Sequence, residues 1–244
     1  MSLVVADFPD LPDVSDLPPG PDIIMMSSTG DAAEYFSHML GVYVAVGEYK
    51  GSRYYRQLHT VKRGNEHFAY KTSSHWYISK DLGSNGWLRS DEKTETIPVK
   101  KWKYWRIFWC DDSDLKFTVY AKDSPPEPCQ EIEISATNMQ TDCDGVYTPT
   151  SDYCNGRPVY INTNNKKVLL VDHEYLKLCG CWAVLDYDES AVDTARMRSG
   201  SAAPDLCPAH PRSKRGWHKF TQYDWKYMGH YENAKIIVKC KKHH

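Results

Sequence analysis

The sequence predicts an all-β protein built from two tandem, similar domains of the β-sandwich or β-barrel kind, as an internal duplication would produce. The first observation behind this prediction is alternation: short segments rich in aromatic and β-branched residues alternate polar and apolar positions along most of the chain. The second is repetition, because a series of motifs occurs twice in the same order. Alternating segments spaced by roughly ten residues are typical of sandwiches, barrels and meanders.

The repeat begins at Gly41-Val42-Tyr43, which returns as Gly145-Val146-Tyr147. It ends at Trp102-Lys103-Tyr104, which we match to Trp225-Lys226-Tyr227. Between these ends the matched residues are Gly51 and Gly156, Tyr55 and Tyr160, Trp76 and Trp182, and Leu88-Arg89-Ser90 and Met197-Arg198-Ser199. The offset between matched residues grows slowly along the chain, as insertions in loops would make it grow.

The strands expected in the first copy cover residues 43–46, 53–56, 68–70, 76–78 and 115–119. Those expected in the second copy cover residues 132–134, 159–161, 168–171, 182–185 and 236–238. Asn85-Gly86 and Asn155-Gly156 predict tight turns, because both residue types tolerate positive φ. One short helix is expected over residues 31–39, where Ala, Glu and Met cluster before Gly41.

The chain divides into three regions. Residues 1–21 are expected to form a flexible acidic leader, because its prolines oppose a helix and its few apolar residues do not offset the entropy of ordering. Residues 22–124 form the first β domain and residues 125–244 the second. The boundary between them lies at the proline-rich segment Pro125-Pro126-Glu127-Pro128.

Composition narrows the class of function. The chain has 30 basic and 32 acidic side chains, and this near balance predicts no nucleic-acid partner. No segment approaches the roughly 20 apolar residues of a membrane-spanning helix, so no membrane span is expected. Leu3-Val4-Val5-Ala6 is too short for the apolar region of a signal peptide.

Cysteine usage nevertheless favours export. All eight cysteines lie at or beyond position 110, which leaves the first domain without a disulfide of its own. An even number concentrated in one domain is typical of an oxidising compartment, so we expect a secreted protein. Cys110 lies between the copies and could pair with Cys129 or stay reduced. Disulfides of undefined pairing are expected among Cys129, Cys143, Cys154, Cys179, Cys181, Cys207 and Cys240.

The motifs also resemble those of known proteins. The repeated Gly-Val-Tyr, the segment Asn155-Gly156-Arg157-Pro158-Val159-Tyr160, a central tryptophan and residues 199–208 are similar to a loose group of tandem β-repeat proteins from marine invertebrates. The likeness spans most of residues 40–240 and is densest in the second copy. It implies a shared architecture and no assigned catalytic role.

Four tryptophans shared by the copies divide into two kinds. Trp76 and Trp182 lie inside apolar segments, which favours a core position. Trp102 and Trp225 lie among charged residues, which favours half-exposed rings that stack on a ligand. We therefore take Trp102 and Trp225 as candidate ligand-binding residues.

Two arginines are candidate partners of these rings. Arg89 and Arg198 occupy matching places in the two copies, and a guanidinium can bind a carboxylate or phosphate through paired N–H groups. The alternative is that each arginine bonds to backbone carbonyls and fixes a loop. Arg157, which follows the Asn155-Gly156 turn, is expected to make a structural contact of that kind.

Motifs for catalysis and metal binding are absent. The chain lacks Gly-x-Ser-x-Gly, a phosphate-binding glycine-rich loop and His-Glu-x-x-His, and we expect no catalytic residue, metal or cofactor. His59, His67 and His75 cluster in the first copy, where they could form a site or reflect surface variation.

These observations favour a secreted, non-enzymatic binding protein whose ligand is a glycan, a glycoconjugate or another small molecule. Aromatic rings suit this function because they stack on the apolar faces of sugars. A cofactor-independent enzyme, either a hydrolase or a luciferase-type oxygenase with an aromatic and histidine-lined pocket, is one alternative. A structural protein of the extracellular matrix is the other. The sequence does not define the ligand or the oligomeric state.

Overall fold

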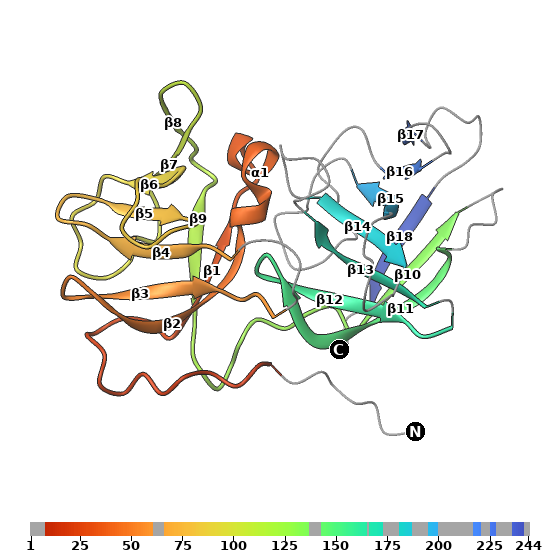
Figure 1. The fold of residues 1–244 in the computed structure, drawn as a ribbon, viewed down its shortest axis with the longest axis horizontal. Helices are drawn as coiled ribbons and strands as arrows, with labels where there is room; N and C mark the ends of the chain where they lie inside the picture. Colours follow the sequence, from red (N-terminus) through yellow and green to blue (C-terminus); the bar gives the residue numbers. More distant parts are fainter. Residues whose placement is uncertain are drawn as a thin grey trace.

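A computed structural model shows that the protein is mostly β, with eighteen strands, one short α-helix and one 3₁₀ turn in the part that it describes. It describes residues 8–60, 66–136, 143–164, 166–172, 181–186, 195–199, 217–220, 225–227 and 236–241. From β15 onward the backbone of the strands is described but their side chains are not. The strands form two nine-stranded antiparallel sheets, and the first of them is curled (Figure 1).

The first sheet has the order β8-β7-β6-β5-β4-β3-β2-β1-β9. Its strands are β1 (Ile23–Ser27), β2 (Gly41–Tyr49), β3 (Ser52–Gln57), β4 (Phe68–Lys71), β5 (Trp76–Ser79), β6 (Leu88–Ser90), β7 (Trp102–Trp105), β8 (Trp109–Asp111) and β9 (Lys116–Tyr120). The helix α1 (Asp31–Tyr35) and the 3₁₀ turn η1 (Ser37–Met39) connect β1 to β2. The Asp112 carboxylate fixes the start of α1 by accepting a hydrogen bond from the Ala32 N–H at 2.9 Å.

The second sheet has the order β17-β16-β15-β14-β13-β12-β11-β10-β18. Its strands are β10 (Glu131–Ala136), β11 (Gly145–Cys154), β12 (Arg157–Asn162), β13 (Lys167–Asp172), β14 (Cys181–Asp186), β15 (Ala195–Ser199), β16 (Trp217–Phe220), β17 (Trp225–Tyr227) and β18 (Ile236–Lys241). In each sheet, eight consecutive strands form a meander and the ninth returns to pair with the first. The prediction of an all-β fold is confirmed, whereas duplication into two domains stays a prediction.

The predicted elements coincide with observed ones. All ten segments expected to be strands fall within strands, apart from Leu115, which precedes β9. The helix expected over residues 31–39 is divided between α1 and η1. The turn at Asn155-Gly156 is confirmed, because Asn155 and Gly156 have φ of 49° and 68°.

Corresponding tyrosines lie in the second strands of the two meanders, β2 and β11. Tyr43 pairs with Ile24 of β1, and Tyr147 pairs with Ile132 of β10. Each ring is fully buried, and each hydroxyl donates to the carbonyl four residues earlier, at Met39 or Cys143. The first motif of the repeat therefore has the same local structure in both sheets.

The last motif of the repeat was matched wrongly. Trp102 of β7 pairs with Ser90, and the residue that pairs with the corresponding Ser199 is Trp217 of β16. Trp225 lies one strand further on, in β17, and pairs with Phe220 as Trp109 pairs with Trp105. The error arose because similar Trp-Lys-Tyr triplets stand in strands with different places in the meander.

The core of the first sheet collects the inward side of the meander together with the apolar residues of α1 and η1. Trp76 is fully buried as predicted, and its indole N–H donates to the Thr94 carbonyl. Trp182 and Tyr160 are fully buried in the core of the second sheet. Burial of such large rings is the main apolar contribution to a small β structure.

The β11–β12 hairpin joins the two sheets, and its turn enters the first one (Figure 1). The Gly156 peptide lies between β2 and the segment after β3: its carbonyl accepts from Val42 N–H, and its N–H donates to the Leu58 carbonyl, both at 2.8 Å. Tyr153 of the same hairpin is buried among Ile23, Val42, Val44 and Leu58. Backbone bonding and apolar contact thus hold the sheets together.

Arg157 completes this junction and confirms the expected structural contact. Its side chain is fully buried, and Nη1 donates to the carbonyls of Ser37 at 2.8 Å and Leu40 at 3.3 Å. The corresponding turn of the first sheet, Lys50-Gly51, is exposed, and a Cβ added to Gly51 would meet nothing within 4 Å.

Residues 8–21 pack against the protein, which differs from the flexible leader that the sequence predicted. Val14 is buried in the first core, and Phe8 contacts Tyr153 with ring centroids 5.7 Å apart. Arg53 holds the segment, since it donates to the Pro18 carbonyl and forms a salt bridge of 2.6 Å with Asp22. Apolar contacts and these bonds offset the ordering entropy that composition alone suggested would prevail.

Cys129 is disulfide-bonded, as predicted, and the disulfides expected at the other cysteines stay predictions. No disulfide joins two of the four cysteines whose side chains are described, Cys110, Cys129, Cys143 and Cys154. Cys181 and Cys240 lie in strands with undescribed side chains, and Cys179 and Cys207 lie outside the described residues. Separately, no helix in the described ranges is long and apolar enough to span a membrane.

A candidate ligand-binding pocket walled by tryptophans

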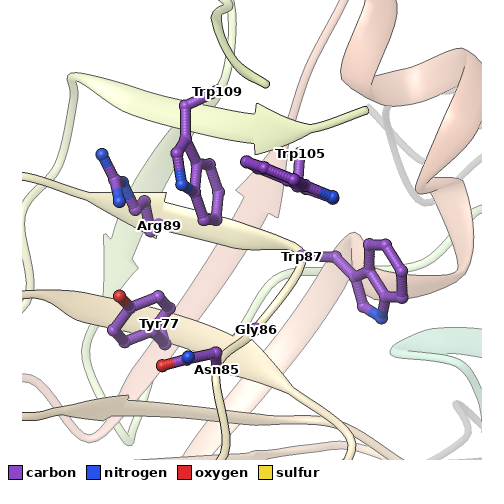
Figure 2. A pocket seen from close by; sticks show the side chains of 7 residues that line it. All are labelled: Tyr77, Asn85, Gly86, Trp87, Arg89, Trp105 and Trp109. Carbon is purple, nitrogen blue, oxygen red and sulfur yellow. The ribbon is translucent and has the colours of Figure 1, made fainter. Parts of the chain in front are cut away.

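A pocket of about 350 Å³ opens on the first sheet near the β7–β8 hairpin. Figure 2 shows the side chains around it, which come from β5, β6, β7, β8 and the segment before β6. The lining residues are Tyr77, Asn85, Gly86, Trp87, Arg89, Trp105 and Trp109.

Strand alternation explains why these side chains share one face. Along β6, Leu88 and Ser90 are fully buried while Arg89 between them is not, and along β7 Trp102 and Tyr104 enter the core. Side chains of successive residues point to opposite faces of a strand. Arg89 and Trp105 are therefore directed away from the core, and the pocket lies on the outer face of the sheet.

The rings and the guanidinium form one continuous group. Trp105 and Trp109 pack edge to face at 5.3 Å between ring centroids, and Tyr77 lies 6.4 Å from Trp109. The Arg89 guanidinium carbon is 4.2 Å from the centre of the Trp109 ring, a cation–π contact. The pocket thus combines aromatic walls with one fixed cation.

Asp91 lies at the centre of a group of charged side chains at the rim of the pocket. Its carboxylate lies 3.0 Å from Arg89 Nε, 3.0 Å from Lys103 Nζ and 3.4 Å from His75 Nε2. Burial by itself would raise the pKa of Asp91, but the hydrogen bond from Lys103 and the charges of Arg89, Lys103 and His75 lower the pKa overall. Asp91 therefore stays ionised and orients Arg89 beside the rings.

Trp87 forms the far wall and is half exposed. Its side chain is 51% exposed, and one face stacks on Phe36 with ring centroids 6.2 Å apart. The peptide just before it lies against β5, because a Cβ on Gly86 would be 1.9 Å from the Ile78 carbonyl oxygen. Glycine at this position lets the chain approach closely enough to set Trp87 at the rim.

The tight turn predicted at Asn85-Gly86 is wrong. The chain turns earlier, at Asp81–Ser84, where Gly83 has a φ of 90° and Ser84 N–H donates to the Asp81 carbonyl. Neither Asn85 nor Gly86 has positive φ. Close backbone packing rather than turn geometry explains this glycine.

Of the predicted site residues, only Arg89 is seen in the pocket. The prediction that the Trp102 ring is half exposed and binds a ligand is wrong. The ring is 1% exposed, and its indole N–H donates to the Pro98 carbonyl at 2.8 Å. Neighbouring charges misled the prediction, since Lys103 lies on the opposite face of β7 and Lys101 precedes the strand. Arg198 lies in β15 and Trp225 in β17, with side chains outside the described set.

Trp87, Trp105 and Trp109 were not predicted from the sequence as site residues. Alternation could have identified Trp105, because a buried Trp102 and Tyr104 place the following residue outside. Identifying Trp87 and Trp109 as site residues required knowledge of which strands pair. For example, a hydrogen bond from Trp105 N–H to the Trp87 carbonyl, at 2.7 Å, brings Trp87 and Trp105 together.

The three histidines that cluster in the sequence, His59, His67 and His75, lie in different parts of the structure. His67 is buried and hydrogen-bonds to Gln57 Oε1 at 2.9 Å, while His59 Nδ1 accepts from Asn155 N–H at the junction of the sheets. His75 alone lies near the pocket, through Asp91. Within the described ranges, no group of three or more His, Cys, Asp or Glu side chains could hold a metal ion.

Comparisons of this chain with protein-family models, with curated proteins and with solved structures found no match.

Proposed function

We propose that the protein is a secreted binding protein and that its pocket takes a carbohydrate or glycoconjugate. The observation that carries the proposal is the group of Trp87, Trp105 and Trp109 around one pocket, with Arg89 stacked on Trp109. Exposed indoles stack on the apolar faces of sugar rings, and such surfaces are enriched at binding sites. Secretion rests on the cysteine content of the second half.

The polar groups favour an acidic sugar. Arg89 can direct N–H donors to a carboxylate or sulfate while the face of its guanidinium stacks on Trp109. Lys103 lies at the same rim through Asp91 and adds a second positive charge. A neutral sugar would stack on the rings but would have no acidic group to pair with these two cations.

A second site in the other sheet is part of the proposal. By strand register, Arg198 of β15 corresponds to Arg89, Phe220 of β16 to Trp105, and Trp225 of β17 to Trp109. An arginine, an aromatic residue and a tryptophan thus occupy the same three places, as duplication of a binding unit would produce. Two sites on one chain would strengthen binding to a multivalent glycan.

Titration calorimetry with sulfated, carboxylated and neutral hexasaccharides, chosen after a glycan-array screen, tests the proposal. We expect Trp109→Ala to weaken binding at the first site at least about tenfold, because truncation of a stacking anchor costs about 2 kcal/mol. Arg89→Met should weaken binding of the acidic sugars more than that of the neutral ones. Val119→Ser, which alters a 49% exposed residue of β9, is the matched control.

Stoichiometry separates the two sites. Wild-type protein should bind two hexasaccharides per chain, and Trp225→Ala should reduce this number to one. No binding of any glycan would contradict the proposed function as a whole. A stoichiometry of one that Trp225→Ala leaves unchanged would contradict the second site alone.

One observation favours a hydrolase as a second candidate. Ser74 Oγ lies 2.7 Å from His75 Nδ1, and His75 Nε2 lies 3.4 Å from Asp91 Oδ1. The three side chains therefore form a continuous chain of contacts, from serine to histidine to aspartate, beside the pocket. In such an arrangement His75 would accept the proton of Ser74 as the hydroxyl attacks an ester. Hydrolysis of p-nitrophenyl acetate that Ser74→Ala abolishes would support this function. A hydrolysis rate that is the same with wild-type protein, with Ser74→Ala and without protein would exclude it.

A further inference from the structure

The β7–β8 hairpin presents the most exposed large apolar side chains in the described part of the protein. Ile107 is 81% exposed and Phe108 is 67% exposed. They stand at the turn between Trp105 and Trp109, which pair with each other, and Arg106 N–H closes the turn by donating to the Phe108 carbonyl at 3.1 Å. Figure 1 shows this hairpin standing away from the rest of the first sheet. The turn is therefore a fixed projection with an apolar end.

Exposure of the Ile107 and Phe108 side chains to water is unfavourable. Ordinary surfaces carry apolar side chains singly, whereas a contiguous exposed group marks a contact surface. Here Trp87, 51% exposed, lies next to the same hairpin, because its carbonyl accepts a hydrogen bond from Trp105 N–H. None of the three is needed to cover the first core, because Trp102, Tyr104 and Phe117 already fill it.

We infer that the β7–β8 hairpin is a membrane-docking tip, with Ile107 and Phe108 entering the apolar layer of a phospholipid bilayer. The inference does not depend on the sugar proposed above. Its first support is shape and area: a stable protein interface buries about 800 Å² on each partner, far more than two side chains on a convex turn offer. A bilayer accepts a small apolar projection without a complementary groove.

The residues below the apex match the next layer of a bilayer. Trp105 and Trp109 flank the turn, and tryptophan prefers the boundary between acyl chains and head groups. Because the pocket is lined by these same indoles, docking would place it at the level of the head groups.

Charge supports the same occupant. The Arg106 guanidinium stacks over Tyr35, 4.7 Å from the ring centre, and forms no salt bridge within the described ranges. The acidic residue at the end of the hairpin, Asp111, lies 3.6 Å from Lys103 Nζ and is paired with it. Arg106 is thus a cation of the same turn, held over Tyr35 of α1, that can meet a lipid phosphate.

Co-sedimentation with protein-free vesicles of phosphatidylcholine and phosphatidylserine (4:1) tests the inference. Wild-type protein should bind, and Ile107→Ser/Phe108→Ser should partition at least about tenfold more weakly, given the free energy of transfer of the lost apolar groups. Val119→Ser should bind as wild type does. Thermal melts of each variant show whether the fold is retained, as substitution of exposed residues predicts.

Depth is tested with the same vesicles. Brominated acyl chains should quench the tryptophan fluorescence of the wild type and not that of the double variant. Failure of wild-type protein to bind these vesicles, or equal binding by the double variant, would overturn the inference. So would binding confined to native membranes that protease treatment abolishes, because the occupant of the tip would then be a protein.

Discussion

The buried guanidinium of Arg157 lies 2.8 Å from the Ser37 carbonyl oxygen, although 120 positions separate the two residues in the chain. This bond joins the β11–β12 hairpin to the turn that precedes β2. Because Arg157 is fully buried, its N–H groups depend on protein acceptors, and the Ser37 and Leu40 carbonyls are two of these. The junction of the two sheets is therefore specific as well as apolar.

Arg157→Met should destabilise the protein by about 2–4 kcal/mol, because it leaves buried carbonyls without their charged donor. Urea unfolding monitored by fluorescence measures this loss. Arg56→Met is the matched control, since the Arg56 side chain is 51% exposed and should change stability by less than about 0.5 kcal/mol. Equal effects of the two substitutions would show that the junction does not depend on Arg157.

Gly156→Ala and Gly51→Ala compare the two corresponding turns. Both glycines have positive φ, 68° and 79°, so each substitution should cost about 1–2 kcal/mol of backbone strain. At Gly156 the added Cβ would also lie 2.8 Å from Val42 N, whereas at Gly51 it meets nothing within 4 Å. We expect Gly156→Ala to be the more destabilising by at least about 1 kcal/mol in thermal unfolding. A larger effect at Gly51 would contradict the observed junction.

Trp102→Ala should mainly reduce the stability of the protein, whereas Trp87→Ala should mainly reduce ligand binding. Removal of the buried Trp102 ring should cost about 3–5 kcal/mol of stability, because it leaves a cavity beside Phe117. Loss of the half-exposed Trp87 ring should cost about 1 kcal/mol or less and act on the pocket. Melting curves run beside a glycan titration separate the two effects. A stable Trp102→Ala protein with weakened binding would restore Trp102 as a ligand contact.

The Asp91 network should give the protein a measurable dependence on pH. The pKa of Asp91 is lowered by folding, so its contribution to stability is complete above the unfolded pKa of about 3.9 and is lost as pH falls through the folded pKa. Wild type should therefore melt above Asp91→Asn near neutral pH, and the difference should vanish at acid pH. Asp81→Asn, which removes a carboxylate at an exposed turn outside this network, is the matched control. A difference that is constant with pH would contradict the network.

The sequence alone determined ten of the eighteen strands and the position of two core tryptophans. Alternation of polar and apolar residues depends on local geometry, because successive side chains of a strand face opposite sides, and so the ten predicted strands were found. Trp76 and Trp182 were placed in the core for the same reason. The Asn155-Gly156 turn was also predictable, since positive φ is a property of the residues that form it.

Tertiary structure decided the junction and the pocket. Which strands pair, and in which register, sets whether Trp109 meets Arg89 and whether Trp225 or Trp217 corresponds to Trp102. The burial of Arg157 likewise depends on a contact between two sheets that are distant in sequence. Such contacts follow from free energies summed over the whole chain, and a local pattern of residues does not specify them.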